Sequence, residues 1–326
     1  MEIERWKGSA MIGAGAMLLL LAPLSVWSHG IAGKRFFPTT LTIDDPFMND
    51  EASLTFSHLR DATGPDEPSS VTTLFSGDWA KTLFAGRFGI FGLAIDGNFQ
   101  HKSIHGEHDI NGFGNMGLGA KWQFFTSDKH ETLLSIGVDA EVGGTGDSRL
   151  ADPFSTVSPI FFFGQGAGDL PDPLKMLRPL AITGTFSADF PTVTQNELTG
   201  ESPPTTLSWG LSVQYNIQYL QSFVKDVGLR KPFNRMIPLV EFPIQTCINR
   251  DCDGQTTGFA APGVIWFGKY IQLGLEALIP INERSGRDVG VVAQLHFFID
   301  DMFPRTIGKP IFGSKPPYPA WWGGLR

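Results

Sequence analysis

The stretch HKSIHGEHD, residues 101–109, gathers side chains that can bind a metal ion. Imidazoles and carboxylates together are ligands for divalent transition metals. The candidate ligands are His101, His105, Glu107 and His108. The alternative interpretation is a solvated polar loop that is rich in histidine. No cofactor other than such a metal is indicated.

The chain contains two cysteines, Cys247 and Cys252, in the stretch CINRDCDG. In an exported protein such close spacing favours a disulfide that closes a small outer loop.

Catalytic motifs are absent or out of context. The sequence has no GxSxG elbow, HExxH or phosphate loop, and GFGNMG opens a strand where a dinucleotide site needs a helix. Ser187 and Ser212 lie on polar strand faces without evident histidine and acid partners. We therefore expect no enzymatic activity.

Several other charged residues fall at alternate positions of apolar segments. In LLSIGVDAEV, Val138 and Ala140 alternate with Asp139 and Glu141. Period two is typical of a β-strand, because successive side chains point to opposite faces. This pattern gives a set of predicted polar-face residues: Lys121, Asp139, Glu141, Asp189, Gln214, Asn216, Glu276 and His296.

The stretch LSWGLSVQYNIQYL, residues 207–220, alternates over an unusual length and predicts a strand over 206–222. Amphipathic helices that could cover so long an apolar face are nearly absent. A water-soluble sandwich would also alternate, but its strands would be shorter and fewer. In a transmembrane barrel the apolar faces meet lipid, the polar faces meet a lumen, and closure satisfies the backbone. We therefore predict an all-β, antiparallel up-and-down transmembrane β-barrel of about twelve strands.

The twelve strands are predicted near 51–60, 70–81, 86–100, 113–126, 131–144, 155–164, 178–191, 206–222, 235–248, 256–267, 269–281 and 287–300. If both termini are periplasmic, short links and long links should alternate. The links at 82–85, 127–130 and 268 are short, whereas 101–112 and 192–205 are long. Two links depart from this trend, 165–177 and 223–234, and each is predicted to form a short periplasmic helix or an ordered loop.

The first residues of the sequence indicate export. Residues 1–28 have the basic start, apolar core and small-residue cleavage site of a signal peptide. Residues 29–49 are predicted to be a periplasmic or plug segment, 50–302 the barrel, and 303–326 a periplasmic tail. The net charge of −8 and the lack of a basic run argue against nucleic-acid binding.

Four stretches carry a resemblance to known proteins: HGIAGKRFFPTTLTIDDP, GNMGLGAKWQFF, HETLLSIGVDAEVGGTG and GQGAGDLPDPLKMLRPLAITG. The chain resembles Gram-negative outer-membrane barrels, and these stretches resemble uncharacterised transporter-like barrels near the family named for phenol meta-pathway degradation. The resemblance implies passage of small, often hydrophobic molecules. It carries over no functional residue.

We therefore expect a channel or transporter-like barrel in the lipid of a Gram-negative outer membrane, passing a small hydrophobic or cationic solute. An excess of carboxylates on the polar faces favours cations and neutral solutes over anions. Two alternatives remain open. One is a metal-binding surface barrel acting through 101–109, and the other is a structural barrel that binds a periplasmic partner through the C-terminal tail.

Overall fold

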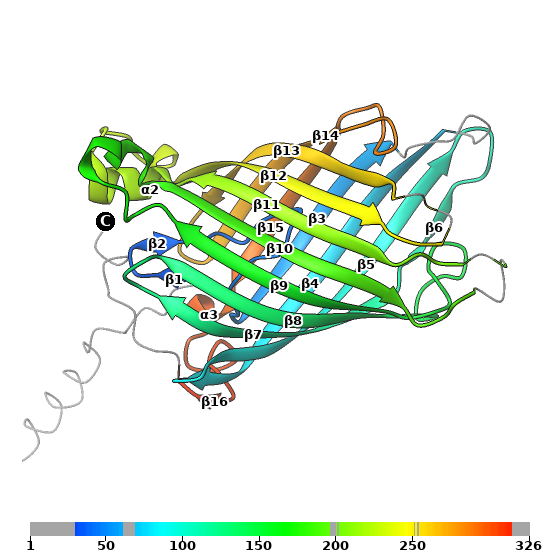
Figure 1. Ribbon diagram of the computed structural model, residues 1–326, viewed down its shortest axis with the longest axis horizontal. Coiled ribbons are helices and arrows are strands. Elements are labelled where there is room, and N and C mark those ends of the chain that lie inside the picture. The colour runs from blue at the N-terminus through cyan, green and yellow to red at the C-terminus, as the bar shows by residue number, and fades with distance from the viewer. Residues whose placement is uncertain are drawn as a thin grey trace, which may run out of the picture.

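The computed structural model describes residues 30–60, 69–195, 200, 202–250, 252 and 254–314. Its main feature is a closed barrel of twelve antiparallel strands (Figure 1), as the alternating sequence pattern predicts. The strands are β3 (Glu51–Arg60), β4 (Ser70–Gly86), β5 (Gly89–Ile104), β7 (Met116–Ser127), β8 (Thr132–Val142), β9 (Thr156–Gly166), β10 (Leu180–Pro191), β11 (Thr206–Tyr215), β12 (Met236–Cys247), β13 (Thr256–Phe267), β14 (Ile271–Pro280) and β15 (Gly290–Phe298).

Each barrel strand pairs with its neighbours in the sequence, which makes the topology up-and-down. The ring closes where β15 pairs with β3, with Leu295 opposite Leu54. The short strand β6 (Ile110–Phe113) folds back on the end of β5 and pairs His101 with Asn111. Closure leaves no free sheet edge in the wall, which is the condition for a sheet to span a membrane.

The alternation in sequence becomes an inside and an outside. On β14, Leu273 and Leu275 are 45% and 53% exposed on the outer face. Gln272 and Glu276, one residue away from them, are buried on the inner face. Because an exposed apolar belt of this kind is stable only against hydrocarbon, the outer face of the barrel is its lipid-facing surface.

Strand β11 is shorter than predicted, and this corrects the interpretation of residues 207–220. The strand ends at Tyr215, and Ile217–Tyr219 form the helical turn α2, followed by a π-helical turn (η3, Leu220–Val224). The Asn216 side chain caps this turn by accepting a hydrogen bond from the Tyr219 amide at 2.9 Å. The alternation beyond Tyr215 therefore does not describe a lipid-facing surface.

For the hairpin between β7 and β8 the sequence predicts either a turn with an odd number of residues or a bulge. Lys121 and Asp139 both lie on the polar face. A two-residue turn that pairs residue 127 with residue 130 would set polar-face residues opposite apolar-face residues, so the hairpin needs one additional residue in the turn or in a strand. The register shifts between Gln123 and Phe125, which is a bulge, and Lys121 pairs with Gly137. The sequence argument for a bulge or an odd turn is confirmed.

The two long links at the short-turn end are ordered, as predicted. The first contains a 3-10 helix (η2, Asp172–Leu177), and the second contains α2, η3 and another 3-10 turn (η4, Phe233–Arg235). No helix within the described ranges is long and apolar enough to cross a membrane.

The C-terminal tail is partly held against the wall. Helix α3 (Ile299–Met302) follows β15, and β16 (Phe312–Gly313) pairs in parallel with Phe84 and Ala85 of β4. The predicted signal peptide and the stretch PPYPAWW, residues 316–322, lie outside the described residues.

The sidedness of the barrel leads to a testable prediction. Single cysteines at Glu107 and at Lys129, placed in a chain whose native cysteines are changed to serine, lie at opposite ends of the barrel. If the short turns are periplasmic, a membrane-impermeant thiol reagent added to intact cells will label position 107 and leave position 129 unlabelled. Lysed cells, in which both should react, provide the control. Labelling of position 129 from outside would reverse the orientation.

Candidate functional site: the barrel lumen

The structure places the predicted polar-face residues inside the barrel wall, but they do not share one environment. Asp139, Glu141 and Asp189 line an open cavity. Four others are buried: Gln214, Asn216, Glu276 and His296. Lys121 contacts Asp44, in the segment that precedes the first barrel strand. Asn216 lies just beyond β11, where it serves as a helix cap.

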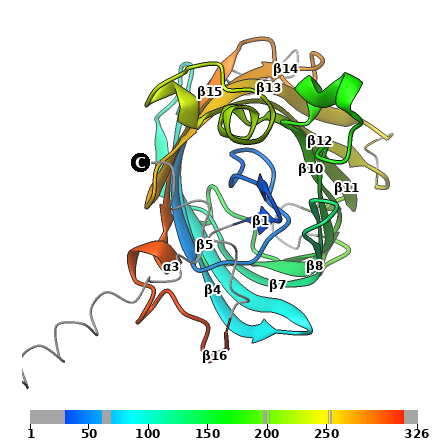
Figure 2. The same ribbon diagram turned by 90° about the vertical axis from the view of Figure 1, so that its left-hand side faces the viewer.

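Residues 30–50, which we call the lumen segment, lie inside the short-turn half of the barrel (Figure 2). The segment begins with a hairpin of two short strands, β1 (Ile31–Ala32) and β2 (Arg35–Phe36). Its side chains are largely buried, including Phe37 and Phe47, which form a cluster with Leu133 of the wall. The space inside the short-turn half of the barrel is therefore filled by the lumen segment.

Arg35 attaches the lumen segment to the short-turn end of the barrel. Its side chain is fully buried and forms an ion pair with Glu131 at 3.0 Å. It also donates hydrogen bonds to the carbonyl oxygens of Pro179, at 2.7 Å, and Arg178. Tyr219 stacks beneath the guanidinium and donates to Glu131 at 2.8 Å. An arginine shared among so many acceptors is a strong, directional attachment.

Lys121 holds the middle of the lumen segment from β7. Its ammonium group lies 2.9 Å from Asp44 and donates to the carbonyl oxygen of Asp45 at 3.0 Å. From the next strand, Ser135 donates to the carbonyl oxygen of Pro46. Lys121 is the only lysine or arginine among the predicted lumen residues, and its charge is therefore already paired with carboxylates of the lumen segment.

Glu241 of β12 makes the most concentrated contact with the lumen segment. One of its oxygens accepts from the Thr42 amide at 2.7 Å, the Thr42 hydroxyl at 2.6 Å and the Leu41 amide at 3.2 Å. Its other oxygen, and both oxygens of neighbouring Glu276, are buried without a hydrogen-bond donor in the described part of the chain. Glu241 thus takes the place of a strand partner for the segment's backbone.

The wall makes room for the lumen segment with glycines. A Cβ on Gly274 would lie 2.5 Å from a methyl carbon of Leu41, and one on Gly210 would lie 2.4 Å from Ile43. The same close approach occurs between Gly92 and Met48 and between Gly164 and Pro46. Segment and wall are therefore complementary in shape over four strands.

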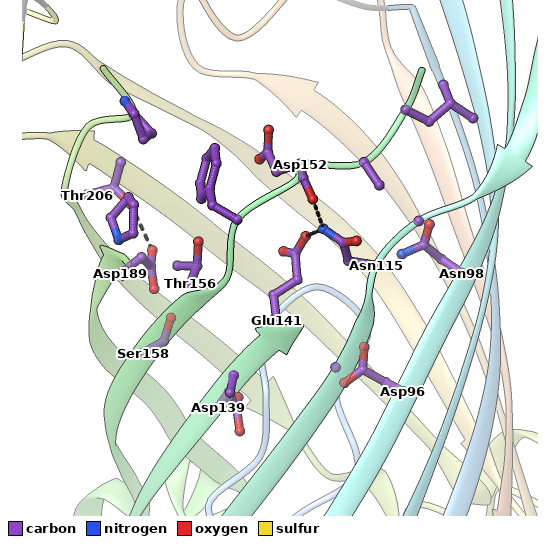
Figure 3. A pocket seen from close by; sticks show the side chains of 18 of the residues that line it. Asp96, Asn98, Asn115, Asp139, Glu141, Asp152, Thr156, Ser158, Asp189 and Thr206 are labelled. Atoms are coloured by element: carbon purple, nitrogen blue, oxygen red, sulfur yellow. Dashed lines mark hydrogen bonds between the residues drawn. The ribbon is translucent and has the colours of Figure 1, made fainter. Parts of the chain in front are cut away.

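The other half of the lumen is open and acidic (Figure 3). A cavity of about 570 Å³ lies there. Its carboxylates come from three strands of the wall, β5, β8 and β10, and from one loop: Asp96, Asp139, Glu141, Asp152 and Asp189. Among the described residues that line it, none is Lys, Arg or His. Such a ring of carboxylates attracts cations and repels anions.

Two pairs of hydrogen bonds organise the cavity mouth. Asn115 donates from one side-chain amide to the Glu141 carboxylate at 2.9 Å and to the carbonyl oxygen of Asp152 at 2.8 Å. This brings the loop that carries Asp152 over the cavity, where burial, and then the charge of Glu141, raises the pKa of Asp152. Asp189 is oriented from β11 by the hydroxyls of Thr206 and Ser208, at 2.8 and 2.9 Å.

The four proposed metal ligands are not brought together as a set. His101 hydrogen-bonds Asn111 at 2.6 Å across the β5–β6 hairpin and lies 3.9 Å from Asp109. His105, Glu107 and His108 follow in the turn of that hairpin, and no group of three or more metal-ligating side chains forms within the described ranges. Elsewhere, Cys247 and Cys252 form the predicted disulfide at the end of β12.

Sequence analysis missed the residues that hold the lumen segment. Arg35, Glu131 and Tyr219 lie in three distant stretches, and the alternating pattern places Tyr219 in the strand predicted over 206–222. One signal was available, since Arg35 directly precedes the apolar residues Phe36 and Phe37. A charge in such a setting requires a buried partner.

Comparisons with known proteins agree with this architecture. No protein-family model and no curated protein matches the chain, so the predicted membership near the phenol meta-pathway family is not shown. A solved structure of the COG4313 outer membrane channel from Pseudomonas putida F1 is similar, with 12% identity and a TM-score of 0.55 over 81% of this chain and 99% of that chain. Two porins are less similar. The KdgM porin has a TM-score of 0.39 and 12% identity over 75% of this chain and 98% of the porin. The NanC porin has a TM-score of 0.44 and 9% identity over 76% of this chain and 98% of the porin.

The closed twelve-stranded ring, its apolar outer belt and its polar lumen define the chain as a Gram-negative outer-membrane β-barrel. The similarity to the COG4313 channel supports this fold assignment.

Proposed function

We propose that this protein is an outer-membrane channel for small cationic or neutral solutes, and that the lumen segment is its plug. The observation that carries the proposal is the division of the lumen into an open acidic half and a filled half. A barrel whose only role was structural would not need a cavity lined by five carboxylates. The neighbours of known structure include proteins described as channels and porins, which supports the same function.

Passage requires the lumen segment to move or to leave a path beside it. The segment packs apolar side chains such as Phe37 and Phe47 against the wall, and its polar attachments, from Arg35, Lys121 and Glu241, can break and re-form in water. Contacts of this kind allow two states of a segment, one docked and one released. A solute that competes for these groups would favour the released state.

Conductance in planar bilayers is the direct test of the proposal. A channel will show discrete current steps after insertion of the purified, folded barrel, whereas a purely structural barrel will show none. The alternative of metal binding at 101–109 is not favoured, because the candidate ligands are not gathered.

Ion selectivity provides a more specific prediction. Changing Asp139 and Asp189 to Asn removes two of the five cavity carboxylates without changing side-chain size. The preference for potassium over chloride, measured from the reversal potential in a salt gradient, should fall clearly. The matched control changes Asp147 and Asp288, which are loop carboxylates outside this cavity's lining, and should leave selectivity unchanged. Equal selectivity in all three proteins would show that the acidic cavity does not lie on the ion path.

A further inference from the structure

The short-turn end of the barrel carries an apolar surface outside the lumen, formed by η2 and by residues 225–235. We call it the rim surface. Six large apolar side chains of the rim surface are 41–57% exposed: Leu174, Met176, Leu177, Val227, Leu229 and Phe233. Large apolar groups clustered in this way on ordered turns indicate a contact surface, because water-facing loops rarely expose so many.

The rim surface is also basic, in a chain whose net charge is −8. The rim surface contains five basic residues and two acidic residues, Asp172 and Asp226, and Asp172 is paired with Arg178. Four exposed basic side chains of the rim surface form no ion pair within the described part of the chain: Lys175, Lys225, Arg230 and Lys231. The carboxylate Asp226 is already engaged by the amide of Gly228 at 2.8 Å. The surface is therefore positively charged and has basic donors available.

One hydrogen bond locates this surface relative to the membrane. Tyr215 is on the outer, lipid-facing side of β11, and its hydroxyl donates to the carbonyl oxygen of Met176 at 3.0 Å. Helix η2 therefore lies against the lipid-facing wall, and it neighbours η3 of the second link. Figure 1 shows these links as the projection at the end of the barrel where α2 is labelled. The rim surface thus continues the apolar belt into the layer where tyrosines mark the membrane boundary.

We propose that the rim surface lies in the headgroup layer and binds anionic glycerophospholipid. The apolar side chains enter the acyl boundary, while the lysines and arginines bind the phosphate groups, as in other basic amphipathic segments at membranes. Positive charge beside apolar side chains, both continuous with the lipid-facing wall, favours lipid over a soluble protein partner.

The test uses a variant in which Lys175, Lys225, Arg230 and Lys231 are changed to Gln. The control carries the same charge change at the other end of the barrel, with Arg60, Arg149, Arg284 and Arg287 changed to Gln. All eight side chains are exposed, so each protein should remain folded, which is checked by faster gel migration of the unheated sample.

Lipid binding is measured by native mass spectrometry, with phosphatidylglycerol or phosphatidylcholine titrated into the detergent-solubilised barrel. The unaltered protein and the control should retain phosphatidylglycerol at lipid concentrations about tenfold lower than phosphatidylcholine. The rim variant should lose this preference. Equal retention of both lipids by the unaltered protein, or an unchanged preference in the rim variant, would overturn the proposal.

Hydrogen exchange of residues 225–235 in nanodiscs gives an independent result. Exchange should be slower with phosphatidylglycerol than with phosphatidylcholine in the unaltered protein, and equal in the rim variant. Exchange that does not depend on the headgroup would overturn the lipid assignment and favour a soluble partner. Neither measurement depends on conduction, so the outcome is separate from that of the channel proposal.

Discussion

The Arg35→Ala variant will conduct far more current than the unaltered barrel. The Arg35 side chain is fully buried and pairs with Glu131 at 3.0 Å. Removing one partner of a buried ion pair costs about 3–5 kcal/mol, because the other charge is left without compensation. Release of the lumen segment exposes Glu131 to water and relieves that cost, so the released population should rise by about a hundredfold or more. Single-channel recording in planar bilayers measures this as a larger open probability.

Two comparisons isolate the cause. Adding Glu131→Gln to Arg35→Ala removes the stranded charge, so the double variant should conduct less than Arg35→Ala alone. Arg149→Ala removes an exposed loop arginine that pairs with Asp147, and it should leave conductance unchanged.

A steric variant tests the same plug without changing any charge. Gly274→Leu places a side chain where a Cβ would already lie 2.5 Å from Leu41, so the lumen segment must shift. Gly97→Leu is the matched strand control, because nothing lies within 4 Å of a Cβ there. If folded Arg35→Ala and Gly274→Leu barrels both conduct no more than the unaltered protein, the segment is a permanent part of the wall and the plug proposal is wrong.

The second large effect concerns the lipid face of β11. Val213 points outward between neighbouring strands, opposite Ile182 and Val240. Val213→Arg places a charge against hydrocarbon at a cost of about 2–4 kcal/mol, so the variant should fold or insert poorly. The measurement is the fraction of protein that is extracted only with detergent and migrates faster when unheated.

The control for this experiment comes from the structure. The alternating pattern places Gln214 on the polar face, which would make Gln214→Arg the obvious control. Gln214 is instead 2% exposed and donates to Thr183 at 3.1 Å, so an arginine there would be overpacked. Ser208→Arg is the better control, because Ser208 lies on the inner face of the same strand beside Asp189. It should fold normally, and equal defects in the two variants would contradict the assignment of an outer lipid face.

The strand pattern, and with it the barrel, was determined by local sequence. Asp139 and Lys121 could be assigned to the inner face because a strand has a period of two, whatever its neighbours are. The same parity argument predicted an odd turn or a bulge in this hairpin, and the structure has a bulge between Gln123 and Phe125, since pairing across a hairpin is a local constraint. The end of β11 could not be predicted in this way. Ile217 and Tyr219 continue the alternation, but the Asn216 cap and the Tyr219 contact with Glu131 form a turn instead.

The division of the lumen was decided only by the tertiary structure. Lys121 and Asp139 look equivalent in the sequence, yet Lys121 is paired with Asp44 of the lumen segment and Asp139 lines the open cavity. That difference depends on where residues 30–50 pass, and their position is set by contacts such as Arg35 with Glu131, 96 residues apart. Periodicity describes only the side chains of one strand. It carries no information about which distant segment fills the space that those side chains enclose.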